Sequence, residues 1–200
     1  MQQILNFIDY TCRLYHIDES HGLDHAIKTL FWSLKITKDV KMNYRECQII
    51  KLSCLLHDMC DKKYMDEKKG IERIRKFLKT QNVDMDMIDQ IVFIIITMSY
   101  SKVVTDGYPT FFDKSTEMCY HIVRNSDLLC SYDLERCIAF KVHCGGTRQE
   151  GILHMFDVFN KRVLRLIKDG YIDDFAKEYA TELHNNAIIQ LEKYEMFKLI

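Results

Sequence analysis

The sequence has few residues that interrupt helices. Among its 200 residues there are one proline, Pro109, and only seven glycines. Proline removes a backbone hydrogen-bond donor, and glycine costs about 1 kcal/mol relative to alanine inside a helix. The scarcity of both residues favours long helices, and a chain of this length suits one domain with a substantial core.

The sequence also lacks an excess of charge and a long apolar segment. Its net charge is −1, with 28% charged and 48% hydrophobic residues, as in an ordinary globular protein. This balance does not indicate nucleic acid or an acidic membrane as a partner. The apolar run Ile91–Met98 is far too short to span a bilayer, and the first residues do not resemble a secretory signal. We therefore expect a cytoplasmic protein without a membrane partner.

None of the eight cysteines forms a CxxC pair. The chain is too long and too rich in ordinary core residues to need a disulfide scaffold. We expect reduced thiols that mostly pack as small hydrophobic side chains, in keeping with a cytosolic location.

Apolar residues recur mostly at helical spacing, without an internal repeat or a long linker. The pattern predicts an all-α fold, a single domain over residues 1–200 with a motif-bearing core at about 21–130 and closing helices at about 150–197. The expected helices cover 2–15, a segment capped by Asp24, a segment opened by Asn43, then 67–80, 85–100, 117–142 with a bend, 150–168 and 171–197.

Three local patterns support these boundaries. Asn43 followed by Glu46 resembles a capping box. The isoleucine run within 85–100 fits either a helix or a buried strand, and we choose the helix because no other segment could pair with a strand. Residues 102–116 contain Asp-Gly and the proline, and we expect a loop there. On the segment capped by Asp24, three apolar residues share one side: Ile27, Phe31 and Leu34.

The adjacent pair His57-Asp58 is notable for its setting. Five apolar or small residues, 52–56, precede it and should place it near the interior. A carboxylate buried there is costly unless it is paired or bound to a metal. Two nitrogen and oxygen ligands alone would hold a divalent ion weakly, so such a site needs further ligands from other helices.

Three segments together resemble the HD-domain metal-dependent phosphohydrolases: HGLDHAIKTL at 21–30, CLLHDMCDKKY at 54–64 and RNSDLL at 124–129. The likeness is closest to the small stand-alone bacterial type, some of which hydrolyse nucleotides, and it extends over roughly Asn6 to Tyr194. The family signature H…HD…D implies that the metal ligands are His25, His57, Asp58 and Asp127.

This resemblance implies one divalent metal ion. Mixed nitrogen and oxygen ligation suits Mn²⁺, Mg²⁺, Fe²⁺, Co²⁺ or Ni²⁺ and does not select among them. The ion would polarise a phosphoryl group and acidify a water molecule. A second ion would need further histidines between Asp58 and Asp127, where only His121 lies. The pair His21 and His25 could instead form a zinc site as in HExxH, but Gly22 stands where the glutamate would be.

Other residues of the motifs are candidates for catalysis and substrate binding. If the helix that carries His57 continues, Asp61 faces the same site one turn later. Asp61 is expected to orient or deprotonate the attacking water or to protonate the leaving group, and Lys63 completes an HDxxDxK motif. The remaining expected contacts to the substrate phosphate are His21, Lys28 and Lys102. The expected substrate is a small phosphorylated compound, a nucleotide above all.

Two departures from the family pattern keep a second function open. Lys28 replaces the usual arginine and loses its bidentate fork. Around Asp127 the sequence lacks the flanking carboxylates and the basic residue of the common DADRLD segment. A catalytically weak or inactive HD domain that binds a nucleotide or a protein partner is therefore the alternative, with a nucleic-acid enzyme or binder as a weaker third hypothesis, since the balanced charge argues against a broad basic face.

Overall fold

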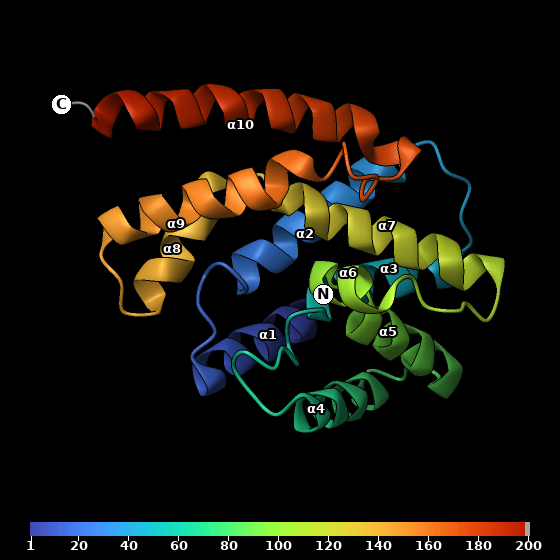
Figure 1. The fold of residues 1–200 in the computed structure, drawn as a ribbon. Helices are drawn as coiled ribbons and strands as arrows, with labels where there is room; N and C mark the ends of the chain where they lie inside the picture. The colour runs from blue at the N-terminus through green and yellow to red at the C-terminus, as the bar shows by residue number, and fades with distance from the viewer. Residues whose placement is uncertain (199–200) are drawn as a thin grey trace. The chain divides into compact units, whose positions relative to one another are not determined.

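A computed structural model of the chain describes residues 1–198, with side chains described through Tyr194. This part of the chain is all-helical and contains no strand, which confirms the predicted all-α fold (Figure 1). The backbone divides into two compact units, Met1–Asp127 and Leu128–Ile200. All residues that the sequence predicts for the site belong to the first unit.

The first unit is built around a buried central helix. It contains α1 (Gln2–Tyr15), α2 (Leu23–Ile36), α3 (Tyr44–Leu56), α4 (Glu67–Thr80), α5 (Met85–Thr97), α6 (Tyr100–Asp106) and most of α7 (Lys114–Cys130). Helix α3 contacts α1, α2 and α5. Its last eight residues, Ile49 to Leu56, are buried except for Lys51. A helix that is apolar on nearly all sides belongs in the middle of a bundle, and α3 therefore carries the following residues into the interior.

The second unit contains α8 (Leu134–His143), α9 (Arg148–Lys161), two short 3₁₀ turns, η1 (Val163–Arg165) and η2 (Asp174–Ala176), and α10 (Lys177–Lys198). Helices α8 and α9 pack closely, since a Cβ atom at Gly151 would lie 2.9 Å from the side chain of Ile138. The predicted helix 150–168 extends too far, since α9 ends at Lys161, and the predicted helix 171–197 starts too early, since α10 begins at Lys177. The chain leaves α9 early because the intervening turns bury Val163 and Leu166.

Side-chain caps set most helix starts in the first unit. The predicted capping box is confirmed: Asn43 accepts a hydrogen bond from the Glu46 N–H, and Glu46 accepts one from the Asn43 N–H. Asp66 and Asp84 cap α4 and α5 with single hydrogen bonds, which their side chains accept from the N–H groups of Lys69 and Met87. Asp24 does not cap α2, whose N-cap is Gly22; the turn before it, closed by the hydrogen bond from His21 N–H to the Asp18 carbonyl, starts the helix earlier.

Two further boundaries differ from the sequence prediction. The segment 102–116 is not a loop throughout, because Ser99 caps a short helix, α6, that ends at Gly107 with φ 78°. The predicted helix 117–142 is two helices: α7 starts where Asp113 accepts a hydrogen bond from the Thr116 N–H, and α8 starts where Asp133 accepts one from the Arg136 N–H. These caps are side-chain hydrogen bonds, which hydrophobic periodicity does not register.

Among the described residues, no single helix has the length and hydropathy to cross a membrane. Helices α5 and α6 reach those values only as a pair, and they are bent by 79° at the break between them.

Helix α2 turns its most apolar side outward. Ile27, Phe31 and Leu34 are 44%, 49% and 63% exposed. The opposite side is buried and carries His25 together with small and polar residues, among them Thr29 and Ser33. The hydroxyls of both residues donate to carbonyls of their own helix, so their burial leaves no unsatisfied donor. The side of α2 that faces the interior is therefore the one with His25 and the hydroxyl groups, and not the one with the largest apolar residues.

Helix α4 supports the segment that follows α3. Gly70 lies against Cys60, and a Cβ atom at Gly70 would come within 2.7 Å of the Cys60 Cα. Cys60 is buried and follows His57-Asp58 by two residues. The missing side chain at Gly70 is therefore what allows α4 to approach this segment.

We expect Gly70→Ala to destabilise the protein, although alanine is the better helix former. The added methyl group must displace the Cys60 backbone, and overpacking of this kind costs about 1–3 kcal/mol, more than the gain of about 1 kcal/mol in helix propensity. Urea unfolding measures the difference. The exposed Lys68→Ala, two residues earlier on α4, is the control and should stay within about 0.5 kcal/mol of the parent. A Gly70→Ala protein as stable as the parent would contradict the close approach.

Candidate metal centre

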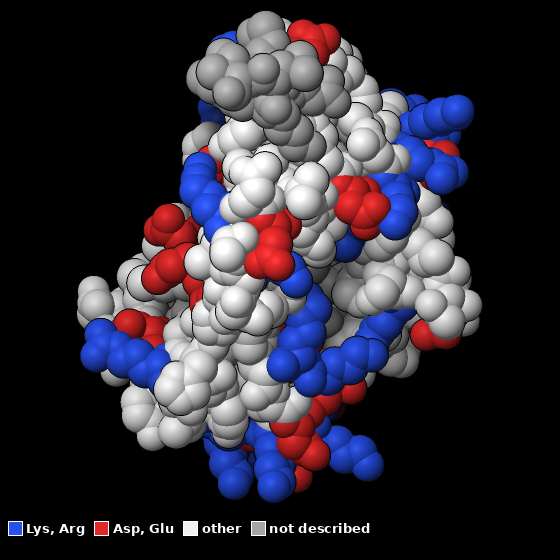
Figure 2. All heavy atoms as spheres, turned by 60° about the vertical axis from the view of Figure 1, so that its left-hand side comes forward, with Lys and Arg blue, Asp and Glu red and all other residues white. Residues whose placement is uncertain are grey.

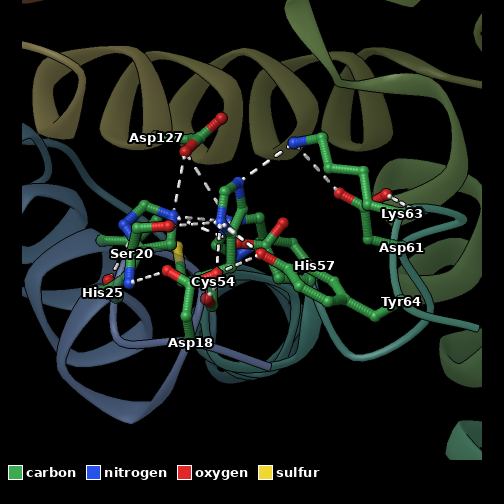
Figure 3. Close-up of polar contacts among 12 residues, drawn as sticks. Asp18, Ser20, His25, Cys54, His57, Asp61, Lys63, Tyr64 and Asp127 are labelled. Atoms are coloured by element: carbon green, nitrogen blue, oxygen red, sulfur yellow. Dashed lines mark hydrogen bonds and ion pairs between the residues drawn. The ribbon is translucent and has the colours of Figure 1, made fainter. Parts of the chain in front are cut away.

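Three helices bring the predicted metal ligands to one point inside the first unit (Figure 3). His25 lies on α2, His57 ends α3 with Asp58 directly after it, and Asp127 lies in the last turn of α7. The Nε2 atoms of His25 and His57 are 3.0 Å apart. His25, His57 and Asp58 form a group that can hold a metal ion, since one ligand atom of each lies within 4.8 Å of the others.

The carboxylates complete a tight cluster of ligand atoms. Asp58 Oδ2 lies 3.3 Å from His25 Nε2 and 3.2 Å from His57 Nε2. Asp127 Oδ1 lies 3.2 and 3.6 Å from the same two nitrogens. Metal–ligand bonds of about 2.0–2.2 Å place neighbouring ligand atoms about 3.0 Å apart in an octahedron and about 3.4 Å apart in a tetrahedron. The observed separations therefore fit one small divalent ion.

The ring of His57 is oriented by the backbone. Its Nδ1 lies 2.9 Å from the carbonyl oxygen of Cys54, one turn earlier on α3. A carbonyl only accepts, so Nδ1 carries a proton, and Nε2 is the nitrogen that faces His25 and the two carboxylates and is left to bind a metal ion. A hydrogen bond from the non-ligating nitrogen is the usual way in which proteins orient a metal-binding histidine.

Burial of the cluster opposes the charged forms of its side chains unless opposite charges lie close to them. The side chains of His25 and His57 are 1% and 5% exposed. Burial alone would lower the pKa of His57, but Asp58 and Asp127 raise that pKa well above its usual 6.5. Burial opposes ionisation of Asp127, yet hydrogen bonds from both histidines hold its pKa well below 3.8. The histidine charge likewise lowers the pKa of Asp58. The site favours two carboxylates together with a cation.

Asp58 shows why a hydrogen-bond network alone accounts poorly for this cluster. Its Oδ2 atom is buried and accepts no hydrogen bond within the described structure, although two imidazole nitrogens face it. A buried carboxylate oxygen of this kind costs free energy unless it is paired or bound to a metal. A divalent ion between the oxygen and the two nitrogens would satisfy all three atoms.

A second group of predicted residues lies next to this cluster. The Lys63 Nζ atom lies 3.1 Å from His21 Nε2 and 3.4 Å from Asp61 Oδ2. The Lys63 N–H also donates to Asp61 Oδ1 at 2.8 Å. The rings of His21 and His25 are 6.3 Å apart between centroids. His21, Asp61 and Lys63 are thus brought together beside the ligand cluster.

The two other predicted lysines are placed differently. Lys102 donates from Nζ to Glu67 Oε1 at 2.9 Å and to the Ile96 carbonyl at 2.5 Å. It braces α6 against α4 and α5 in this conformation. Lys28 is exposed on α2, three residues after His25. Contacts of Lys28 and Lys102 with a phosphate remain predictions.

Sequence reasoning missed three residues of the site: Asp18, Ser20 and Tyr64. Tyr64 donates a hydrogen bond to Asp18 Oδ2 and lies 3.0 Å from His21 Nδ1, and Ser20 Oγ lies 2.7 Å from the same nitrogen. Asp18 Oδ1 accepts from the Ser20 N–H at 2.8 Å, which is an Asx turn. Asp-x-Ser directly before His21 was the available signal for this turn.

The residues that depart from the family pattern near Asp127 point into the core. Asn125 and Ser126 are fully buried. Asn125 Nδ2 donates to the His121 carbonyl at 2.8 Å, and Ser126 Oγ donates to the Ile122 carbonyl at 2.7 Å. Both side chains thus bond to their own helix, while Asp127 alone of the three contributes to the cluster.

A comparison with models of protein families and with curated proteins finds no match for this sequence. Among solved structures, the chain is similar to a structural genomics target from Lactobacillus plantarum, with 19% identity and a TM-score of 0.72 over 99% of this chain and 97% of that chain. It is also similar to YpgQ of Bacillus subtilis, with 18% identity and a TM-score of 0.66 over 98% of this chain and 93% of that chain. For the selenomethionine form of YpgQ, the identity is 21% and the TM-score is 0.65 over 96% of this chain and 94% of that chain. These likenesses show a shared fold.

We expect the affinity of the protein for Mn²⁺ to rise with pH. The carboxylates beside His57 raise its pKa, so a proton occupies the imidazole of the metal-free protein at neutral pH, and metal binding must release it. Below the raised pKa, the apparent Kd should weaken by about tenfold per pH unit. Calorimetry in buffers of different ionisation enthalpy measures both the Kd and the proton release.

The control for this titration is His143→Ala, which removes an exposed histidine of the second unit and should follow the parent. Thermal unfolding gives a second readout. The His57 proton stabilises the metal-free protein fully below the usual pKa of histidine, and this contribution is lost as the pH rises through the raised pKa. Stabilisation by Mn²⁺ should therefore be largest at high pH. A pH-independent Kd without proton release would refute this account.

Proposed function

We propose that the protein is a metal-dependent phosphohydrolase that cleaves a phosphoester or phosphoanhydride of a nucleotide or a similar small phosphorylated compound. The observation that carries the proposal is the convergence of two imidazole nitrogens and two carboxylates, with a lysine-bearing group directly beside them. Its support from the sequence is the ordered resemblance to the HD-domain phosphohydrolases, in which the same four positions form the signature.

The donor set is suited to holding one divalent ion. His25 and His57 would offer neutral nitrogens, and Asp58 and Asp127 would offer two negative charges that balance the ion. When bound, such an ion supplies Lewis acidity toward a phosphoryl oxygen and acidifies water. A phosphoryl transfer needs little covalent help from the protein, so positioning and charge neutralisation dominate its catalysis.

The neighbouring residues have distinct tasks in this proposal. Asp61 accepts the proton of the attacking water or returns one to the leaving group, and its carboxylate is held by the backbone and the ammonium of Lys63. Lys63 carries a positive charge, and its side chain is half exposed, so a phosphate can reach it from solvent. His21 contacts the same ammonium group through Nε2.

A binding role without turnover is the second candidate. It is favoured by the residues next to Asp127, because Asn125 and Ser126 direct their side chains to carbonyls of α7 and add no acid or base to the cluster. Such a protein would bind a metal ion and a nucleotide, or a protein partner, without hydrolysis.

The charge on one face of the molecule, together with the net charge of −1, supports a small substrate over a nucleic acid. On the face shown in Figure 2, Lys and Arg side chains are interspersed with Asp and Glu. A surface that follows a nucleic-acid backbone usually presents a continuous basic patch or stripe. A local cation such as Lys63 is sufficient for a single phosphorylated molecule.

We expect the purified protein to release phosphate or pyrophosphate from at least one nucleotide when Mn²⁺, Mg²⁺ or Co²⁺ is present. The protein with His57→Ala and Asp58→Ala should lose bound metal and all activity, because the remaining two ligands hold a divalent ion weakly. Elemental analysis and a nucleotide panel measure both effects, and His143→Ala is the matched histidine control. Equal hydrolysis by the doubly substituted protein would refute the hydrolase. Binding of metal and nucleotide without turnover would identify the second candidate.

We expect Asp61→Asn to lower kcat by about 10²–10⁴-fold while the metal content stays that of the parent. Loss of a general acid or base has an effect of this size, and the amide still accepts the hydrogen bond from the Lys63 N–H. Steady-state kinetics and elemental analysis of the same samples separate the two quantities. If kcat is unchanged, Asp61 is not the proton carrier; if the metal is lost with the activity, Asp61 acts as a ligand instead.

A further inference from the structure

Five side chains form a continuous polar chain beside the candidate metal centre (Figure 3). In order these are Asp18, Tyr64, His21, Lys63 and Asp61. The first and third come from the turn between α1 and α2, and the others come from the segment between α3 and α4. The chain therefore ties two separate loops together close to two predicted metal ligands: His25, which follows the first loop on α2, and Asp58, which lies in the second.

The direction of hydrogen bonding along this chain follows from two members with fixed roles, the Lys63 ammonium and the Asp18 carboxylate. An ammonium group only donates, so the contact of 3.1 Å between Lys63 Nζ and His21 Nε2 requires Nε2 to accept. At the other end, Asp18 is a carboxylate and only accepts, so the Tyr64 hydroxyl donates to it, at 2.5 Å. The Tyr64 oxygen is then an acceptor for His21, and Nδ1 of His21, 3.0 Å away, must carry the ring proton.

Tyr64 and Ser20 place different demands on His21. The Ser20 hydroxyl lies 2.7 Å from Nδ1 and can either donate or accept, so it fits both tautomers of the ring. The Tyr64 hydrogen is already engaged by Asp18, so Tyr64 fits only the tautomer with a proton on Nδ1. Asp18 is well suited to this role, since it is buried and hydrogen bonds from Ser20 and Tyr64 outweigh that burial and lower its pKa.

We propose that Tyr64 and Asp18 are positioning residues that fix His21 in the Nδ1–H tautomer and thereby hold the ammonium of Lys63 beside the metal centre. In the opposite tautomer, an N–H of His21 would face the Lys63 ammonium, and the lysine would turn away. The inference rests on the proposed function only for what Lys63 does to a substrate. The order of the hydrogen bonds is a property of the protein alone.

The tautomer is measured first, on metal-free protein labelled with ¹⁵N-histidine. Long-range ¹H–¹⁵N correlation spectra distinguish protonated from unprotonated ring nitrogens, and loss of signals in His21→Gln assigns the residue. We expect Nδ1 of His21 to carry the proton in the parent. In Tyr64→Phe we expect a mixture of tautomers, because the acceptor that fits only the Nδ1–H tautomer is gone, the Ser20 hydroxyl fits both tautomers, and Asp18 Oδ2 lies 3.9 Å from Nδ1, beyond hydrogen-bond distance. Asp18→Asn is the second variant, and the exposed Tyr44→Phe, which should match the parent, is the control.

The second measurement is a double-mutant cycle of Tyr64→Phe and Lys63→Ala. It is read on kcat and KM with the best nucleotide of the panel and on the Kd of inorganic phosphate. We expect Tyr64→Phe alone to raise KM by about tenfold, the order expected when a hydrogen bond to a charged group is lost, with a smaller change in kcat. In the Lys63→Ala background the same substitution should have no further effect, because the positioned group is gone.

The outcomes separate this inference from the proposed hydrolase. A proton on Nε2 of His21 in the parent, an unchanged tautomer in both variants, or additive effects of Tyr64→Phe and Lys63→Ala would each overturn the positioning role. A parent that hydrolyses nothing in the panel counts against the hydrolase instead. In that case the tautomer and the phosphate Kd still decide whether Tyr64 and Asp18 act through His21 on Lys63.

Discussion

The contact between the Nε2 atoms of His25 and His57, 3.0 Å apart inside a helical unit, is the constraint on which the other features of the site depend. Two neutral imidazoles whose outer nitrogens are protonated would turn lone pairs toward each other at this distance. Either a proton or a metal ion must lie between them. The carboxylates of Asp58 and Asp127 add two negative charges at the same point and make a divalent cation the better occupant. Burial increases the free-energy cost of leaving any of these charges unpaired.

The sequence predicted the composition of this cluster better than its surroundings. The four predicted ligands lie on three separate segments, yet each segment contains a short motif, and the order of these motifs could be recognised. The all-helical fold followed from the scarcity of proline and glycine and from helical spacing. What the sequence did not show was orientation: α2 turns Ile27 and Phe31 outward and His25 inward, against the direction that hydrophobicity alone favours. There the helix buries an imidazole and leaves two large apolar side chains about half exposed.

The polar chain from Asp18 to Asp61 could not be predicted for a similar reason. Its members are 46 residues apart between Asp18 and Tyr64 and 42 apart between His21 and Lys63. Only the folded packing of two loops brings them into contact, and neither a periodicity nor a spacing rule reports such a pairing. The helix boundaries at Ser99 and Asp133 were missed because they depend on single side-chain hydrogen bonds. The direction of the hydrogen bonds along this polar chain, by contrast, follows from elementary donor and acceptor chemistry once the contacts are known.

The three helices that supply the cluster are far apart along the chain. His25 and His57 are separated by 32 residues, and Asp127 follows after a further segment of about 70 residues, so closing both loops has a substantial entropic cost. An ion bound by all four side chains would act as a reversible cross-link between α2, the end of α3 and α7. Unlike a disulfide, it would not restrict the unfolded chain, in which the four side chains are not assembled; it would stabilise the folded state by binding to that state alone. The same ion would then hold the three helices of the first unit together, and the free metal concentration relative to its Kd would set how much stability it adds.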